Sequence, residues 1–172
     1  MEEKKLYAEL TYEEVVRKYA DMVTKVCLIR CGNIEDARDC FQEVFMKLFE
    51  SEKIFTSQEH LKAWQIRVAM NQSLDIVKQF WRSKITFCGN VMAEDLSVVS
   101  VTDSQDSKTL QYVLSLPVKY RKVLYMYYYE EYEVAEVAEI LGLKESTVKS
   151  QLRRGRELLK KKFGGVTVER AI

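Results

Sequence analysis

The sequence predicts an all-α protein of two small helical domains joined by a flexible linker, with a helix-turn-helix in the C-terminal domain. Glycine (6) and proline (1) are scarce among the 172 residues, which disfavours a turn-rich β fold. Apolar residues recur at helical spacing on both sides of a segment rich in Ser, Asp and Thr, in which this periodicity fades. We therefore expect an N-terminal domain over residues 1–82, a linker over 83–107 and a C-terminal domain over 108–172.

Three long helices are expected in the N-terminal domain, each preceded by a residue that can cap its first turn. Thr11 and Thr56 each stand three residues before a glutamate, which is the pattern of a capping box. Gly32 can end the first helix, and Asn33 can cap the second. The apolar positions at helical spacing are Ala37, Phe41, Val44, Phe45 and Leu48 in the second helix and Leu61, Trp64, Val68, Ile76 and Phe80 in the third.

The C-terminal domain is expected to contain a short segment over residues 108–115 and a helix that starts at Pro117, a residue favoured in a first helical turn. Residues 134–153 fit a helix-turn-helix. Gly142 supplies the positive φ of the turn, and small or apolar residues on both sides let the two helices approach. These residues are Val137, Ala138, Leu141, Leu143 and Val148.

The second helix of this motif is strongly basic and points one face outward. Residues 141–162 hold eight basic and two acidic side chains, a net charge of +6, although the whole chain carries only +1. A solvated helix without a ligand is the alternative, but the motif around it favours binding in the major groove of DNA. The compensating acidic surface elsewhere suits a basic protein partner or none. The residues expected on the exposed face are Ser146, Thr147, Lys149, Ser150, Arg153 and Arg154.

Several functional classes are disfavoured. No apolar run approaches the roughly 18 residues of a membrane span, and the N-terminus lacks an apolar signal core, so we expect a cytoplasmic protein without membrane insertion. A single histidine, His60, and the lack of a phosphate-binding glycine loop argue against an enzyme, and no catalytic residue or cofactor is expected. The four cysteines show no C-x-x-C pair, so buried, reduced thiols are favoured over a metal site, although Cys27 and Cys31 could share a helix face.

Three blocks of sequence, in this order, resemble a bacterial RNA polymerase sigma factor of the extracytoplasmic-function type of the sigma-70 family. They are "EDARDCFQEVFMKLFE", "LKAWQIRVAMNQSLDIVKQFWR" and "LPVKYRKVLYMYYYEEYEVAEVAEILGLKESTVKSQLRRGRELLKK". The resemblance implies a factor that binds core RNA polymerase, directs it to promoter DNA, both duplex and melted strand, and is inhibited by an anti-sigma factor. Domain two would be residues 1–82 and domain four residues 108–172. The alternative is a self-sufficient helix-turn-helix regulator whose N-terminal domain senses a ligand or dimerises.

The resemblance also implies roles for individual residues. Those that would dock on the clamp helices of the polymerase's largest subunit are Asp39, Gln42, Glu43 and Phe45, as an acidic rim beside an exposed aromatic ring. Those that would melt and read the downstream promoter element are Trp64, Asn71, Asp75, Lys78, Arg82 and Lys84. At the upstream element Lys149, Ser150, Arg153 and Arg154 would approach base edges and Thr147 a phosphate. Trp64 has an equal claim as a core residue, and Phe45 also fits the apolar stripe of its helix, so that it can serve both the core and the docking surface.

Some positions depart from the family pattern. Lys144 stands where a capping residue is common before the recognition helix, and Gly155 stands where alanine is usual, which costs about 1 kcal/mol if the site is exposed. The segment after the domain-two helix holds fewer cations than is usual in the family. The tyrosine run over residues 125–132 is expected to finish a small core, while a partner interface and base stacking stay open as alternatives.

Overall fold

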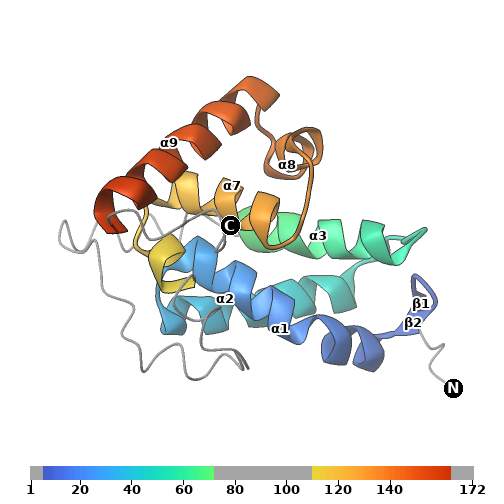
Figure 1. Cartoon of the computed structure of the whole chain (residues 1–172). Helices are drawn as coiled ribbons and strands as arrows, with labels where there is room; N and C mark the ends of the chain where they lie inside the picture. Colours follow the sequence, from blue (N-terminus) through green and yellow to red (C-terminus); the bar gives the residue numbers. More distant parts are fainter. Residues whose placement is uncertain (1–5, 72–109, 164–172) are drawn as a thin grey trace, which may run out of the picture.

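A computed structural model of the chain describes residues 6–71 and 110–163 (Figure 1). Their regular secondary structure is helical apart from a short antiparallel hairpin of β1 (Leu6–Tyr7) and β2 (Leu10–Thr11). They form two helical units, and the second contains the helix-turn-helix, so the predicted all-α, two-domain fold is confirmed. The expected linker over 83–107 lies outside the described residues, as do Ile76 and Phe80.

The N-terminal unit consists of α1 (Tyr12–Cys31), α2 (Ile34–Glu50) and α3 (Gln58–Asn71). The caps expected for α1 and α2 are both present. The Thr11 hydroxyl accepts a hydrogen bond from the Glu14 amide, and the Asn33 side chain accepts one from the Asp36 amide. Gly32 ends α1 in the left-handed conformation, with φ of 80°. These caps explain why two long helices can follow each other with only two residues between them.

The start of α3 differs by one residue from the expectation. Ser57, and not Thr56, caps the helix: the Ser57 carbonyl accepts from the Leu61 amide at 3.1 Å and its hydroxyl accepts from the His60 amide at 3.1 Å. The prediction was wrong because Thr56 and Ser57 are both residue types that can cap a helix, and the path of the chain, not the glutamate at position 59, decides which of them faces the free amides.

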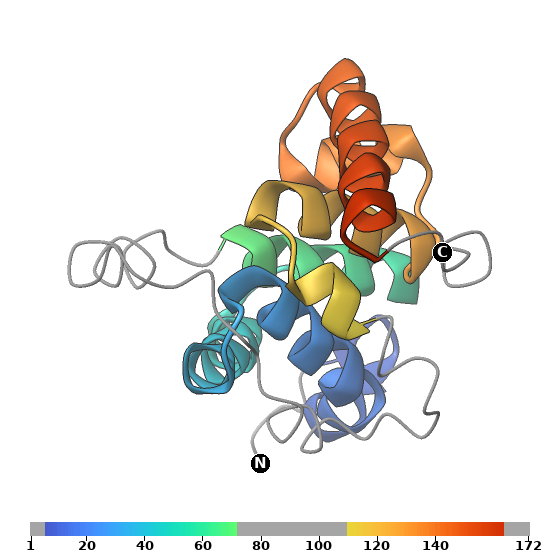
Figure 2. The ribbon, with the colours of Figure 1, turned by 60° about the vertical axis from the view of Figure 1, so that its left-hand side comes forward.

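The C-terminal unit consists of a helical turn over residues 110–114, α7 (Val118–Tyr128), α8 (Val134–Leu141) and α9 (Glu145–Phe163). Pro117 stands at the N-cap of α7, one residue before the helix begins. Glu133 and Glu136 form a capping box at the start of α8, with the Glu133 amide donating to the Glu136 carboxylate at 2.8 Å. Figure 2 shows α9 on the outer side of this unit.

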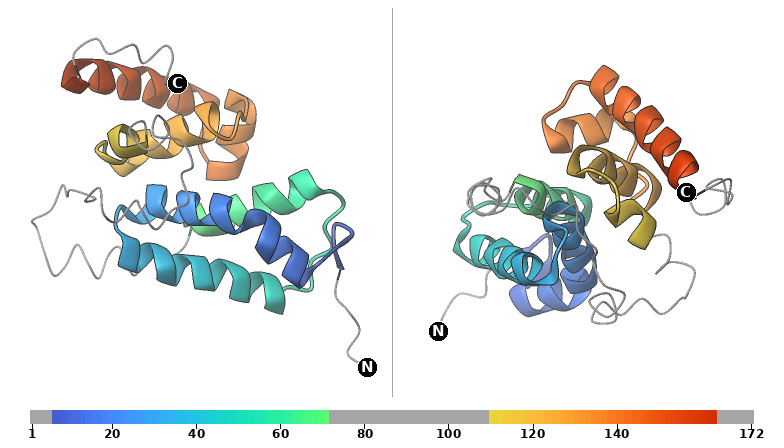
Figure 3. Two further views of the ribbon diagram at one scale, coloured as in Figure 1. Left: turned by 60° about the horizontal axis from the view of Figure 1, so that its bottom comes forward. Right: turned by 90° about the vertical axis from the view of Figure 1, so that its left-hand side faces the viewer.

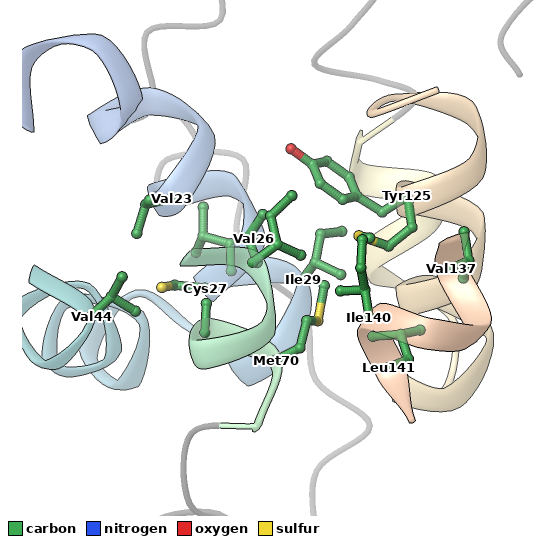
Figure 4. Packing of buried hydrophobic residues seen from close by; sticks show 14 of the residues in the cluster. Val23, Val26, Cys27, Ile29, Val44, Met70, Tyr125, Val137, Ile140 and Leu141 are labelled. Carbon is green, nitrogen blue, oxygen red and sulfur yellow. The ribbon is translucent and has the colours of Figure 1, made fainter. Parts of the chain in front are cut away.

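The two units pack against each other, and their apolar residues form one continuous core. The contact joins α1 to α7 and α3 to α8. Figure 4 shows Ile29 and Met70 of the N-terminal unit beside Tyr125 and Ile140 of the C-terminal unit, and all four are at most 5% exposed. As a result α2 and α9 lie on opposite sides of the molecule, with α1, α3 and α7 between them (Figure 3, left).

Gly155 is buried, which changes the meaning of this departure from the family pattern. A Cβ atom built there would lie 2.8 Å from the Leu124 Cδ1 atom and 3.4 Å from the Tyr120 Cβ atom, both on α7. The glycine therefore lets α9 approach α7 closely, and its low helix propensity is accompanied by closer packing of the two helices.

We expect Gly155→Val to lower the free energy of unfolding by about 1–3 kcal/mol, because the added methyl groups overpack the contact with Leu124. Lys160→Val introduces the same residue on the exposed side of the same helix and should cost less than about 0.5 kcal/mol. Urea unfolding of the two variants measures the difference. Equal effects would show that helix propensity alone matters at position 155.

Candidate nucleic-acid interface

The turn between α8 and α9 fixes how the basic helix is presented. Gly142 has φ of 65°, its amide donates to the Glu139 carbonyl at 3.3 Å, and the Leu143 amide donates to the Ala138 carbonyl at 2.8 Å. The inner side of α9 then rests on the core through Val148 and Leu152, which are at most 3% exposed. The expected inward residues Val137, Ala138 and Leu141 are also buried.

The outward side of α9 holds the predicted basic face. Ser146, Lys149, Ser150, Arg153 and Arg154 are exposed, and Thr147 is half-buried. Lys149 pairs with Glu145 at 3.9 Å and Arg153 with Glu157 at 3.2 Å, both at i,i+4 spacing. Such exposed pairs contribute about 0.3–0.5 kcal/mol, so either cation can leave its carboxylate for a stronger acceptor.

Two hollows flank Arg154 on this face. One, of about 320 Å³, is lined by Lys119 and Tyr120 of α7 together with Ser146, Thr147, Ser150, Gln151 and Arg154. The other, of about 380 Å³, is lined by Tyr120, Arg153, Arg154, Glu157, Leu158 and Lys161. Lys119 therefore joins the basic face from a second helix, with its ammonium 4.9 Å from the centre of the Tyr120 ring.

A second stripe of functional interest runs along α3. Trp64, Arg67 and Asn71 follow one another at spacings of three and four residues, so they share one side of the helix. Arg67 and Asn71 are exposed, while Trp64 is half-buried and has its ring edge-on to Phe55 at 5.5 Å. Trp64 thus serves the core and also reaches the surface.

The surface of α2 carries the third stripe. Asp39, Gln42, Met46 and Phe49 are spaced by three, four and three residues, and all four are exposed, with Phe49 at 60% and Met46 at 58%. Glu43 lies beside this stripe, half-buried, with its carboxylate 3.9 Å from the Lys47 ammonium. The stripe therefore combines one carboxylate, one amide and two large apolar side chains on α2, the helix that lies across the molecule from α9 (Figure 3, left).

Three of the four cysteines lie on α1 and α2, and the fourth, Cys88, lies outside the described residues. Cys27 and Cys40 are buried and Cys31 is half-buried, and the Cys40 thiol donates to the Ala69 carbonyl at 3.7 Å. Hydrogen bonding between Cys31 and Cys40, together with burial, raises the pKa of the Cys31 thiol above its ordinary value. Among the described residues no cluster of histidine, cysteine or carboxylate side chains is arranged to hold a metal ion.

Comparison with known proteins identifies the family. Residues 15–83 match the profile of sigma-70 region 2 and residues 108–159 match that of sigma-70, region 4, so the two together span more than half of the chain. The chain belongs to the sigma-70 family. It is 28% identical to the ECF RNA polymerase sigma factor SigW of Bacillus subtilis, over 88% of each chain, which places it in the extracytoplasmic-function group.

Two further relatives agree with this sigma-factor assignment. The ECF RNA polymerase sigma factor SigE of Mycolicibacterium smegmatis is 31% identical over 87% of this chain and 60% of its own length. The co-crystal structure of the sigma factor RpoE with the anti-sigma factor NepR from Bartonella quintana superposes with a TM-score of 0.66. It covers 90% of this chain and 98% of that chain at 17% identity, which supports the fold.

One residue of the expected polymerase-binding set lies elsewhere than predicted. Phe45 is 5% exposed, with its ring 4.8 Å from that of Phe41, so it is a core residue of this sigma factor and not an exposed aromatic. The exposed ring beside the acidic rim belongs to Phe49, one turn later. Both phenylalanines fit the apolar pattern of the helix, and the pattern alone cannot tell which of them is the last to be covered.

Other expected residues are either present at the surface or outside the described part of the chain. Asp39, Gln42 and Asn71 are exposed, and their binding roles stay predictions. Asp75, Lys78, Arg82 and Lys84 lie outside the described residues. Three residues of these surfaces, Lys119, Arg67 and Phe49, were not predicted from the sequence, although the last two lie three to four residues from predicted ones.

We expect Gly142→Ala to reduce the free energy of unfolding by about 1–2 kcal/mol, because an L-residue is strained at positive φ. No atom lies within 4 Å of a Cβ at this position, so the effect should come from the backbone alone. Gly142→Asn is the matched control, since asparagine tolerates this conformation, and it should cost less than the alanine variant. Urea denaturation measures the free energy of unfolding of both variants, and equal losses in the two would contradict the backbone explanation.

Proposed function

We propose that this sigma factor binds core RNA polymerase, directs it to specific promoters and helps to open the duplex there, and that an anti-sigma factor keeps it inactive. The observation that carries the proposal is the placement of two different surfaces on opposite sides of one small molecule (Figure 3, left). A basic helix-turn-helix faces one way, and a stripe with exposed apolar residues faces the other. The factor performs no covalent chemistry in this scheme and acts in the cytoplasm, where the polymerase is.

The upstream promoter element is read by the C-terminal unit, within a domain four that we place over residues 108–172. Arg153 and Arg154 are suited to bidentate contacts with guanine in the major groove, with Lys149 and Ser150 beside them. Ser146, Thr147 and Lys119 line one hollow at the edge of this face, which suits hydroxyl and ammonium contacts to backbone phosphates. Phosphate contacts then position the helix, and base contacts specify the sequence.

The N-terminal unit, within a domain two over residues 1–82, contributes the polymerase contact and the downstream reading. Asp39, Gln42, Met46 and Phe49 form the polymerase-facing stripe, in which the aromatic ring is the anchor that hot spots of interfaces usually contain. Trp64 and Asn71 face the opened strand, because an amide can satisfy both a donor and an acceptor of an unpaired base. The expected downstream residues Asp75, Lys78, Arg82 and Lys84 complete this proposal.

Transcription in vitro tests the function as a whole. Core polymerase is supplied with a genomic fragment library, and start sites are mapped with and without the purified chain. We expect new start sites only when both proteins are present. If the chain instead binds duplex DNA tightly without polymerase, at symmetric sites about one helical turn apart, it is a self-sufficient regulator.

Base and phosphate contacts on the basic face should respond differently to substitution. Arg154→Ala should weaken promoter binding of the holoenzyme by about 1–3 kcal/mol and relax the base preference at one position. Lys119→Ala should weaken binding to all promoters about equally and lower the slope of affinity against salt by about one ion. Affinities measured over a salt series on promoters with single-base changes separate the two. A sequence-specific loss in the lysine variant would contradict the assignment.

Substitution of Phe49 and of Phe45 should have different effects on polymerase binding and on stability. Phe49→Ala should weaken binding to core polymerase by about 2 kcal/mol, while the free energy of unfolding falls by only about 1 kcal/mol, because the ring is largely exposed and contacts the Tyr12 ring edge-on. Phe45→Ala should lower the free energy of unfolding by about 3–5 kcal/mol, because the ring is buried. Competition binding to core polymerase and urea unfolding check both. Unchanged polymerase affinity in the Phe49 variant would remove that residue from the interface.

A further inference from the structure

Positively charged side chains lie together where α1 ends against α7. Arg121 of α7 is 7% exposed, and its guanidinium donates to the carbonyls of Ile29 and Arg30 in the last turn of α1. Gly32 leaves the space for this guanidinium, because a Cβ atom there would lie 2.9 Å from one of its terminal nitrogens. The next residue of α7, Lys122, lies close enough to Arg30 for the two side-chain charges to interact.

The side chain of Arg30 is buried at this point without a partner for its charge. Arg30 is 7% exposed, and its Nε atom meets no acceptor in the part of the chain that the structure describes. No carboxylate of the described residues forms an ion pair with it either. Asp36 stands at the start of the next helix, but its carboxylate accepts from the Asn33 side chain at 2.6 Å. A buried guanidinium that lacks acceptors is costly, so an anion that supplied them would bind favourably.

Lys122 places a second cation at the same point. Its side chain is half-buried and forms no ion pair with a described residue. Burial, and then the positive charge of Arg30, lower the pKa of the Lys122 ammonium below its ordinary value. Cys31 and Asn33, beside Arg30, are half-buried too, so solvent reaches the edge of this region. One cation from each unit therefore awaits compensation at a place that a small solute can enter.

These two side chains suit the oxygens of a phosphate group. A guanidinium presents a planar fork of donors that matches two phosphate oxygens, and an ammonium adds three donors around a compact charge. A phosphate monoester carries a charge of about −1.5 to −2 at pH 7, which balances two cations. A phosphodiester of nucleic acid or a single carboxylate carries one negative charge, so either would leave one cation uncompensated.

We propose that Arg30 and Lys122 form a binding site for a doubly charged phosphate group, carried by a small monoester or by free phosphate. The phosphate oxygens replace the acceptors that the Arg30 guanidinium lacks. Neither residue belongs to the surfaces that we propose for promoter DNA and for core polymerase. A duplex is too wide to reach a guanidinium that is 7% exposed, whereas a small anion can enter beside the half-buried Lys122.

Nitrogen-15 NMR of the whole chain tests the site, because the Nε–H signal of Arg30 reports the acceptors around it. Methyl phosphate and inorganic phosphate are titrated at constant ionic strength, with dimethyl phosphate as the singly charged comparison. We expect both dianions to shift the Arg30 signal to saturation and dimethyl phosphate to bind about tenfold more weakly. Tighter binding of methyl phosphate than of inorganic phosphate identifies a monoester as the ligand, and the reverse identifies free phosphate. Shifts that never saturate, which indicate an adventitious ion only, or equal binding of dimethyl phosphate overturn the proposal.

A single-stranded oligonucleotide without terminal phosphates represents the other source of phosphate groups. It should leave the Arg30 signal in place, even where it binds elsewhere on the protein. If it shifts this signal at lower concentrations than methyl phosphate does, the site belongs to nucleic acid and the proposal is wrong.

Substitutions at the two positions should each abolish most of the binding. Arg30→Met and Lys122→Met remove one cation and keep a long side chain, and each should weaken methyl phosphate binding by about tenfold in isothermal titration calorimetry. Arg17→Met is the matched control, because it removes an exposed arginine from the same helix as Arg30, and it should leave the affinity unchanged. Unchanged affinity in both the Arg30 and the Lys122 variants would exclude the site.

Urea unfolding gives a result that damage to the fold cannot imitate. The midpoint of the wild-type chain should rise with methyl phosphate at constant ionic strength, because the ligand binds only the folded state. Without phosphate, the midpoint of Arg30→Met should be no lower than that of the wild type, since the variant lacks a buried charge without acceptors. Added methyl phosphate should then leave the variant unchanged. A variant that is less stable from the start and still gains as much as the wild type would show that Arg30 supports the fold and binds no ligand.

Discussion

The structure depends on how the positive charge of Arg121 is satisfied in the middle of the molecule. A guanidinium that is 7% exposed is costly unless its hydrogens meet acceptors, and two of those acceptors belong to the last turn of α1. The apolar contact around it joins Ile29 and Met70 to Tyr125 and Ile140. This contact buries apolar surface, but it does little to fix the orientation of one unit relative to the other. The arginine fixes this orientation, because its hydrogen bonds form only when α7 lies at one position relative to α1.

This contact also explains how charge is distributed over the molecule. Because α1, α3 and α7 form the middle layer, the basic helix α9 and the helix α2 are kept on opposite faces. A nearly neutral chain can then present a cationic surface to a polyanion, while the carboxylates of α2 stay on the other side of the molecule. The small net charge limits non-specific attraction to nucleic acid, so local charge on α9 decides where DNA is bound.

The sequence predicted the local features of this fold and missed those that depend on distant neighbours. Caps at Thr11 and Asn33, the helix end at Gly32 and the positive φ at Gly142 follow from residues close together in the chain, so their chemistry can be recognised there. Phe41, Phe45 and Phe49 show the limit. Successive members four residues apart drift by about 40° around a helix, and only the packing partner fixes where burial stops. Arg121 lies 92 residues along the chain from Ile29, whose carbonyl accepts its hydrogen bond, and no local pattern indicates such a contact.

Gly32 carries two separate demands, because it adopts a left-handed backbone and it also leaves room for the Arg121 guanidinium. A change at this position would break a helix end and an inter-unit contact in one step, so selection can hardly adjust one without the other. Arg121 and Glu139 carry no backbone demand of this kind. Arg121 bonds to the α1 carbonyls and Glu139 lies 3.9 Å from Arg67 of α3, so substitutions at these two positions can adjust how firmly the two units hold together while the glycine stays fixed.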